Sequence, residues 1–83
     1  MENTLISQRV GRSIEQMRKN RGLTKVQLAE RTGITRQKLS EIEQGSSTVA
    51  MSFYCRVLNA LGCELEVVPK AMPTLDELGD LFR

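Results

Sequence analysis

Apolar residues recur at intervals of three and four along the first part of this 83-residue chain, as they do on the inward face of a helix. This interval predicts an opening helix from about Thr4 to Asn20. The basic residues expected on or near its outer faces are Arg12, Arg18, Lys19 and Arg21. Its inward stripe consists of Ile6, Val10, Ile14 and Met17. A further helix is predicted from about Ala50 to Leu61. Its inward stripe consists of Met51, Tyr54, Leu58 and Leu61, widened by Val57.

Between these stripes, the residues from Leu23 to Gly45 predict two short helices joined by a tight turn. Thr24, followed three residues later by Gln27, forms a capping box, in which each side chain accepts a hydrogen bond from the backbone of the other residue. The first helix of the pair is therefore expected over residues 25–32, with Val26, Leu28 and Ala29 as its apolar positions. Gly33 can adopt a positive φ at little steric cost, so the chain can turn sharply there.

The second helix of the pair is expected from Arg36 to Gln44, with Thr35 as its N-cap. Its inward side has only Leu39 and Ile42, and the rest of its surface is polar. A helix this short is marginal alone and must be held by packing. A short helix that is fixed by packing and has an exposed, polar N-terminal half can contact a binding partner.

The run A-E-x-x-G-I-T-x-x-x-L-S-x-I-E-x-G, from Ala29 to Gly45, resembles the helix-turn-helix of the phage-repressor family, also called the Xre or Cro/C1 family. The resemblance extends from about Val10 through Gly62. It implies an all-α, five-helix domain that binds double-stranded DNA, with the second helix of the pair meeting base edges and the first lying across the backbone. Where the family usually has glutamine, this chain has Lys25, which keeps a phosphate donor but lacks the neutral amide that can brace the second helix.

Polar residues around the second helix of the pair are the candidates for DNA contact. Arg36 and Gln37 are the strongest, since arginine suits guanine and glutamine suits adenine. The base-contact candidates are Thr35, Arg36, Gln37, Lys38, Ser40 and Glu41. The phosphate candidates are Thr24, Lys25, Ser46 and Ser47. A solvated helix face is the alternative for the polar residues, and Glu41 can equally pair with Lys38 or Lys25.

The charge is unevenly distributed along the chain. Residues 1–47 carry nine basic and five acidic side chains, a net charge of +4, whereas residues 48–83 carry three basic and five acidic ones, a net charge of −2. The basic part contains the helix pair, as neutralisation of DNA phosphates requires. The acidic part is expected to face something other than DNA.

Composition argues against an enzyme and against a cofactor. The chain has no histidine, which is the commonest general base and metal ligand. No nucleophile and base pair, metal-ligand cluster or phosphate-binding glycine loop is visible either. Cys55 and Cys63 have no disulfide or zinc spacing and are predicted to be small buried residues in a reducing cytoplasm. We expect no signal peptide and no membrane association.

Residues 63–67 alternate between apolar and charged types, and Val68 follows before Pro69, which predicts a short C-terminal β-strand over residues 63–68. No partner strand is predicted within the chain, and an unpaired strand edge is costly. We therefore expect the strand to pair across a homodimer, which would bind an inverted-repeat operator. The dimerisation candidates are Cys63, Leu65, Val67 and Val68.

The run M-S-F-Y-C-R-V-L-N-A-L-G, followed by C-E-L-E-V-V-P, is similar to HipB-type antitoxins. This similarity implies a dimeric repressor that regulates its own operon and binds a kinase-like toxin. Two alternatives stay open. One is a stand-alone phage or restriction-modification regulator, and the other is a protein-interaction module whose helix-turn-helix does not bind DNA.

Two regions are expected along the chain. Residues 1–69 form the helix-turn-helix domain with its dimerisation strand, and residues 70–83 form an acidic tail that is flexible or folds on a partner. The apolar residues of this tail, as partner-binding candidates, are Leu75, Leu78, Leu81 and Phe82. Packing of the tail back onto its own dimer is the alternative.

Overall fold

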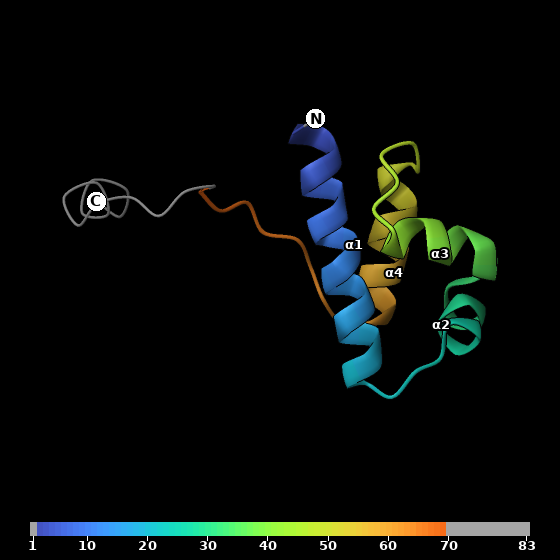
Figure 1. The fold of residues 1–83 in the computed structure, drawn as a ribbon. Coiled ribbons are helices and arrows are strands. Elements are labelled where there is room, and N and C mark those ends of the chain that lie inside the picture. Colours follow the sequence, from blue (N-terminus) through green and yellow to red (C-terminus); the bar gives the residue numbers. More distant parts are fainter. Residues whose placement is uncertain (1, 70–83) are drawn as a thin grey trace.

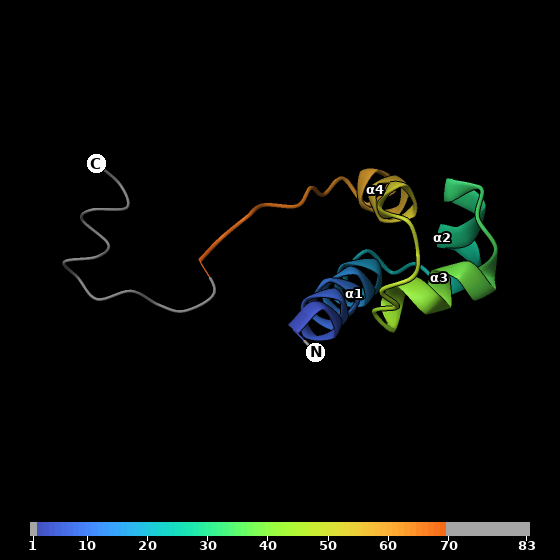
Figure 2. The same ribbon diagram turned by 90° about the horizontal axis from the view of Figure 1, so that it is seen from above.

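The computed structural model describes residues 2–69, and these residues contain four helices. They are α1 (Glu2–Asn20), α2 (Lys25–Thr32), α3 (Arg36–Glu43) and α4 (Met51–Ala60). The C-terminal end of α3 lies against α1, and its N-terminal end points away from α1 (Figure 1). Seen from above, α1 and α4 lie on one side of the bundle and α2 with α3 on the other (Figure 2).

The core lies where these four helices meet, and it is aliphatic except for one tyrosine. Its buried members are Ile14, Leu28, Ala29, Leu39, Ile42, Val49, Tyr54, Val57, Leu58 and Leu61. Most of the predicted stripes are therefore confirmed, and Val10 and Met17 pack partly buried against the core. Burial of aliphatic side chains holds together helices that are individually too short to be stable.

Four residues that were expected to be buried are exposed instead. Ile6 is exposed in the part of α1 that precedes its closest approach to α3. Met51 is exposed at the first position of α4. Val26 lies about 160° around α2 from Leu28, given about 100° per residue, so the two cannot both face the core. Cys55 is exposed on α4, although Cys63 is half-buried.

The helices α1 and α3 approach each other so closely that only glycine fits at one point of contact. A Cβ atom on Gly11 would lie 2.4 Å from the carbonyl oxygen of Ile42 and 2.7 Å from that of Glu43. Glycine in a helix interior costs stability relative to alanine, and here it allows backbone contact between two helices. The hydrophobic pattern of α1 did not predict this contact.

The predictions of five helices and of a C-terminal strand are wrong for the described residues, which contain four helices and no strand. Residues 63–67, which follow α4, show no helical stripe, because apolar residues there alternate with charged ones. Residues 63–69 are irregular, since a strand needs a hydrogen-bonded neighbour and the described chain supplies none.

The predicted dimerisation residues therefore do not lie on a strand. The Cys63 N–H donates to the Leu58 carbonyl at 2.8 Å, so this residue completes the end of α4 and packs against the core. Leu65, Val67 and Val68 are exposed on the segment that runs away from the bundle past α1 (Figure 1). The tail residues 70–83, with Leu75, Leu78, Leu81 and Phe82, lie outside the described residues.

Candidate nucleic-acid interface

The turn between α2 and α3 forms as its residue types predict. At the start of α2, Thr24 Oγ1 accepts a hydrogen bond from the Gln27 N–H at 3.1 Å, and Gln27 Oε1 accepts one from the Thr24 N–H at 2.8 Å. At its end Gly33 has a φ of 74°, and its N–H donates to the Ala29 carbonyl at 2.9 Å. The predicted capping box and left-handed glycine are both confirmed.

The position of helix α3 is fixed by contacts at its ends and along its inward side. Thr35 Oγ1 accepts a hydrogen bond from the Lys38 N–H at 3.0 Å and so caps the first turn. Leu39 and Ile42 are fully buried, as predicted. The helix stops at Glu43, and Gln44 is its C-cap. The result is a short helix whose inward face is anchored and whose outer face is polar.

A buried ion pair ties the C-terminal end of α3 to α1. Arg18 Nε lies 2.7 Å from Glu43 Oε2, and Arg18 Nη2 lies 3.2 Å from Glu43 Oε1. The Nη1 atom of Arg18 also donates to the Leu23 carbonyl at 2.8 Å. One guanidinium therefore joins the end of α1, the segment before α2 and the end of α3.

This ion pair corrects the expectation that Arg18 lies on an outer face. Its side chain is 8% exposed and that of Glu43 is 3% exposed. The available sequence signal is the position of Glu43 directly after the inward-facing Ile42, which places a carboxylate toward the core and requires a buried cation. In the sequence, Arg18 directly follows Met17, the last residue of the predicted inward stripe.

The base-contact candidates divide into two groups by exposure. Thr35, Arg36 and Gln37 are exposed. Lys38, Ser40 and Glu41 are half-buried, and Lys38 Nζ lies 3.6 Å from Glu41 Oε1. The pairing of Glu41 with Lys38, one of the two alternatives to a base contact, is therefore formed in the free protein.

The outer face of α3 extends one residue further than the sequence predicted. Gln37, Glu41 and Gln44 follow each other at intervals of four and three, so they form one row along the side opposite the core. Gln37 and Gln44 are exposed. Gln44 was missed as a candidate, although its spacing from Gln37 was the available signal. We call these three residues the outer row.

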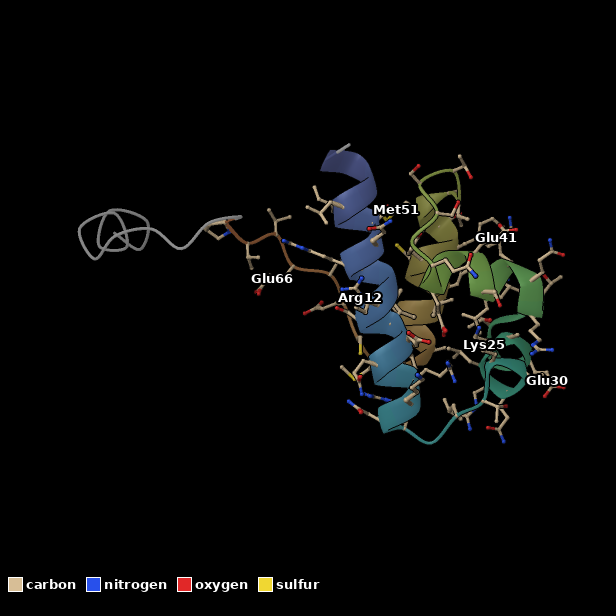
Figure 3. The ribbon with its side chains drawn as sticks, viewed as in Figure 1. Arg12, Lys25, Glu30, Glu41, Met51 and Glu66 are labelled. Atoms are coloured by element: carbon tan, nitrogen blue, oxygen red, sulfur yellow. The ribbon has the colours of Figure 1, made fainter. Side chains whose placement is uncertain are left out.

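Among the phosphate candidates, Lys25 contacts α3 directly. Its Nζ atom lies 3.4 Å from Ser40 Oγ, on one flank of α3. Although Lys25 lacks the neutral amide that can brace the second helix, its ammonium group contacts α3 at this position. Figure 3 shows Lys25 where α2 meets α3, whereas Glu66 lies on the segment beyond α1.

The loop after α3 is ordered by hydrogen bonds from its own neighbours. Ser46 Oγ and Thr48 Oγ1 lie 3.0 Å apart, and the Tyr54 hydroxyl donates to the Ser46 carbonyl at 2.7 Å. Burial raises the pKa of Tyr54 above its ordinary value of 10.0. Ser47 is exposed, so of the two loop candidates it is the more accessible to a phosphate.

Two further observations apply to the part of the chain that the structure describes. No group of three or more histidine, cysteine, aspartate or glutamate side chains lies together there as a metal site would require. None of the helices there is both long enough and apolar enough to cross a membrane.

Comparison with known proteins gives a consistent result. The model of the family described as "Helix-turn-helix domain" matches residues 9–71. An immunity repressor protein of Bacillus phage phi105 is 37% identical over 59 residues, which cover 71% of this chain and 41% of that protein. The chain therefore corresponds to less than half of the phage protein's length.

A second relative comes from an archaeon. An HTH-type transcriptional regulator of Methanothermobacter thermautotrophicus is 41% identical over 51 residues, which cover 61% of this chain and 74% of that protein. No solved structure matches the chain significantly. From the capped helix pair, the matched family model and these two relatives, we conclude that the chain belongs to the Xre-type helix-turn-helix family.

Proposed function

We propose that this protein is a sequence-specific, DNA-binding transcriptional regulator that inserts α3 into the major groove. The observation that carries the proposal is the presentation of α3. Its inward side is anchored by Leu39 and Ile42, its end is tied to α1 by Glu43, and its outer row is polar, with Gln37 and Gln44 exposed. Direct recognition of base edges needs a helix held in one position with polar side chains facing outward.

Within this proposal the side chains divide by what they contact. Arg36 and Gln37, exposed in the first turn of α3, contact base edges. Ser47 and the N-terminal end of α2 face the sugar-phosphate backbone, where the positive end of the helix dipole favours an anion. Thr24 caps that end. Lys25 adds a positive charge to it while its ammonium contacts Ser40.

Repression is the most specific regulatory role that the comparisons favour. The phage relative is named an immunity repressor and the archaeal one a transcriptional regulator. A stand-alone repressor is accordingly our first hypothesis. The proposal includes no catalytic step and no cofactor.

The antitoxin hypothesis has less support than the repressor hypothesis. The similarity to HipB-type antitoxins rested on a helix and a C-terminal strand, of which the helix is present as α4 whereas residues 63–69 are irregular. Neither relative is named as an antitoxin. A kinase-like toxin is therefore not part of the proposal. Copurification of such a kinase with the native protein would restore it.

Binding as a homodimer to an inverted repeat stays a prediction. A helix of eight residues reaches only a few base pairs, so two copies on adjacent half-sites would supply the affinity that one copy lacks. Sedimentation of the free protein and of its DNA complex measures the number of copies directly.

The test of the proposal is a selection from a randomised duplex library, followed by titration of the selected duplex and a random duplex of equal length. Arg36→Ala is expected to cost about 1–3 kcal/mol on the selected duplex and little on the random one. Lys25→Ala is expected to weaken binding to both. Lys19→Ala, which removes an exposed charge on α1, is the matched control and should change neither strongly.

Two results would contradict the proposal. If no duplex is enriched and no salt-dependent binding is measured, the protein is better described as a protein-interaction module. If Arg36→Ala and Lys25→Ala cause equal losses on both duplexes, α3 does not recognise sequence in the proposed way.

A further inference from the structure

The aromatic ring of Phe53 on α4 lies near one flank of α3, and two cationic side chains approach this ring. The Nζ atom of Lys38 lies 5.3 Å from the centroid of the Phe53 ring, and the Cζ atom of Arg56 lies 5.8 Å from it. A cation within about 6 Å of such a centroid is attracted by the negative face of the ring. The ammonium of Lys38 is thus attached to α4 through Phe53 and to its own helix through Glu41.

The position of Lys38 on α3 explains why its side chain goes toward α4. With about 100° per residue, Lys38 lies about 40° around the helix from the fully buried Ile42 and about 100° from Gln37. Its stem therefore leaves α3 beside the core and not from the outer row. Ser40, on the opposite flank, contacts Lys25. The outer row thus lies between two flanks that are each held by a neighbouring helix.

We propose that Phe53 is a positioning residue of the DNA-binding surface, whose ring keeps the Lys38 ammonium on the flank of α3, where it contacts phosphate and not base edges. This inference rests on the proposed function of α3. A lysine free to swing into the groove can donate to O6 and N7 of guanine. A lysine held on the flank adds a charge that neutralises phosphate without regard to sequence.

The inference gives Lys38 a different role from the one that the sequence suggested. Its position in the first turn of α3 had made it a candidate for base contact. It also gives α4 a part in recognition, although α4 does not belong to the helix pair. Arg56 is exposed on α4 and approaches the same ring, so it adds a second positive charge to this flank.

The alternative is that Phe53 only fills space, because the residue is half-buried and packs against the core. Two substitutions separate these roles. Phe53→Leu keeps an apolar side chain and removes the aromatic face, whereas Phe53→Tyr keeps that face. Leu58→Val is the matched control for stability, because Leu58 is buried on the same helix but lies about 140° around it from Phe53.

Each variant is titrated on the duplex selected by the wild-type protein and on a random duplex, at several salt concentrations. In the protein with Phe53, Lys38→Ala should weaken both by the same factor and reduce the salt slope by about one. Phe53→Leu should lower the preference for the selected duplex by about two- to fivefold, the factor that corresponds to one exposed cation–π contact. Phe53→Tyr and Leu58→Val should keep the preference.

A second measurement needs no DNA. Protons that lie over an aromatic face resonate upfield, so the side-chain methylene protons of Lys38 should be shifted in the wild-type NMR spectrum and in Phe53→Tyr. The shift should disappear in Phe53→Leu. If Phe53→Leu does not fold, Phe53→Met takes its place, because it also removes the aromatic face and keeps an apolar side chain.

Three outcomes would overturn the inference. A loss confined to the selected duplex in Lys38→Ala would mean that Lys38 contacts bases. An unchanged preference in folded Phe53→Leu would mean that the ring only fills space. Methylene protons of Lys38 at ordinary positions in the wild-type spectrum would mean that the ring does not hold the side chain. Failure of the wild-type protein to prefer any duplex is a separate result, which contradicts the proposed function.

Discussion

Replacing Arg18 with methionine removes the partner of a buried carboxylate while keeping most of the side-chain volume. The guanidinium makes two contacts with Glu43, at 2.7 and 3.2 Å, and donates to the Leu23 carbonyl at 2.8 Å. The Glu43 side chain is only 3% exposed, so water cannot replace the lost donors without movement of α3. The variant therefore leaves a charge in the interior, which is strongly unfavourable.

The size of the effect follows from known costs of such changes. Removing one partner of a buried ion pair costs about 3–5 kcal/mol. A domain of this length has a total stability of about 4–12 kcal/mol, at about 0.05–0.15 kcal/mol per residue. Arg18→Met should therefore remove much of the free energy of unfolding. Arg18→Met with Glu43→Leu should recover most of it, because exchanging a whole buried pair for apolar residues is close to neutral.

The assay is urea unfolding followed by far-ultraviolet circular dichroism at low temperature, where marginal variants are still folded. With a slope of about 1 kcal/mol/M, a loss of about 3 kcal/mol lowers the midpoint by about 3 M. The control is Lys19→Met, because Lys19 pairs with Glu15 at 3.6 Å on the surface and such a pair contributes under about 1 kcal/mol. A midpoint for Arg18→Met close to that of the control would refute the reasoning.

Two further predictions concern backbone contact and pH. Gly11→Ala should lower the urea midpoint more than Gly22→Ala. A new Cβ at Gly11 would overlap the Ile42 carbonyl oxygen, whereas at Gly22 it meets nothing within 4 Å and only the positive φ of 67° opposes it; equal losses would contradict this. Stability should fall as pH rises from about 10.0 toward the raised pKa of Tyr54, since the unfolded chain loses the phenolic proton first. Tyr54→Phe should remove this alkaline component, and the chain's single tyrosine can be titrated by its absorbance. An identical alkaline loss in Tyr54→Phe would assign it to other groups.

The helix pair could be predicted from sequence because its boundaries depend on neighbours in the chain. Thr24 and Gln27 satisfy each other's backbone groups within one turn. Gly33 takes a positive φ, and Thr35 caps the first turn of α3. Capping and turn formation involve residues at most a few positions apart, so their residue types were sufficient evidence.

The exposure of the site residues could be predicted only in part. Helical spacing correctly separated Leu39 and Ile42 from the polar side of α3. Spacing alone did not reveal that Lys38 is drawn to Phe53 or that Lys25 reaches Ser40, because both contacts come from other helices. The same limit explains why the alternation of residues 63–67 suggested a strand, since a strand forms only beside a partner.

The sequence by itself therefore determined the two central helices, the turn between them, most of the core and the family. Only the tertiary structure decided that Arg18 is buried against Glu43, that Gly11 allows α1 to touch α3, and which flank of α3 faces α4. The physical reason is the range of the interactions. Hydrogen bonds within a turn are set by residues close in the chain, whereas a buried ion pair, a backbone contact and a cation over a ring depend on how separate helices pack in space.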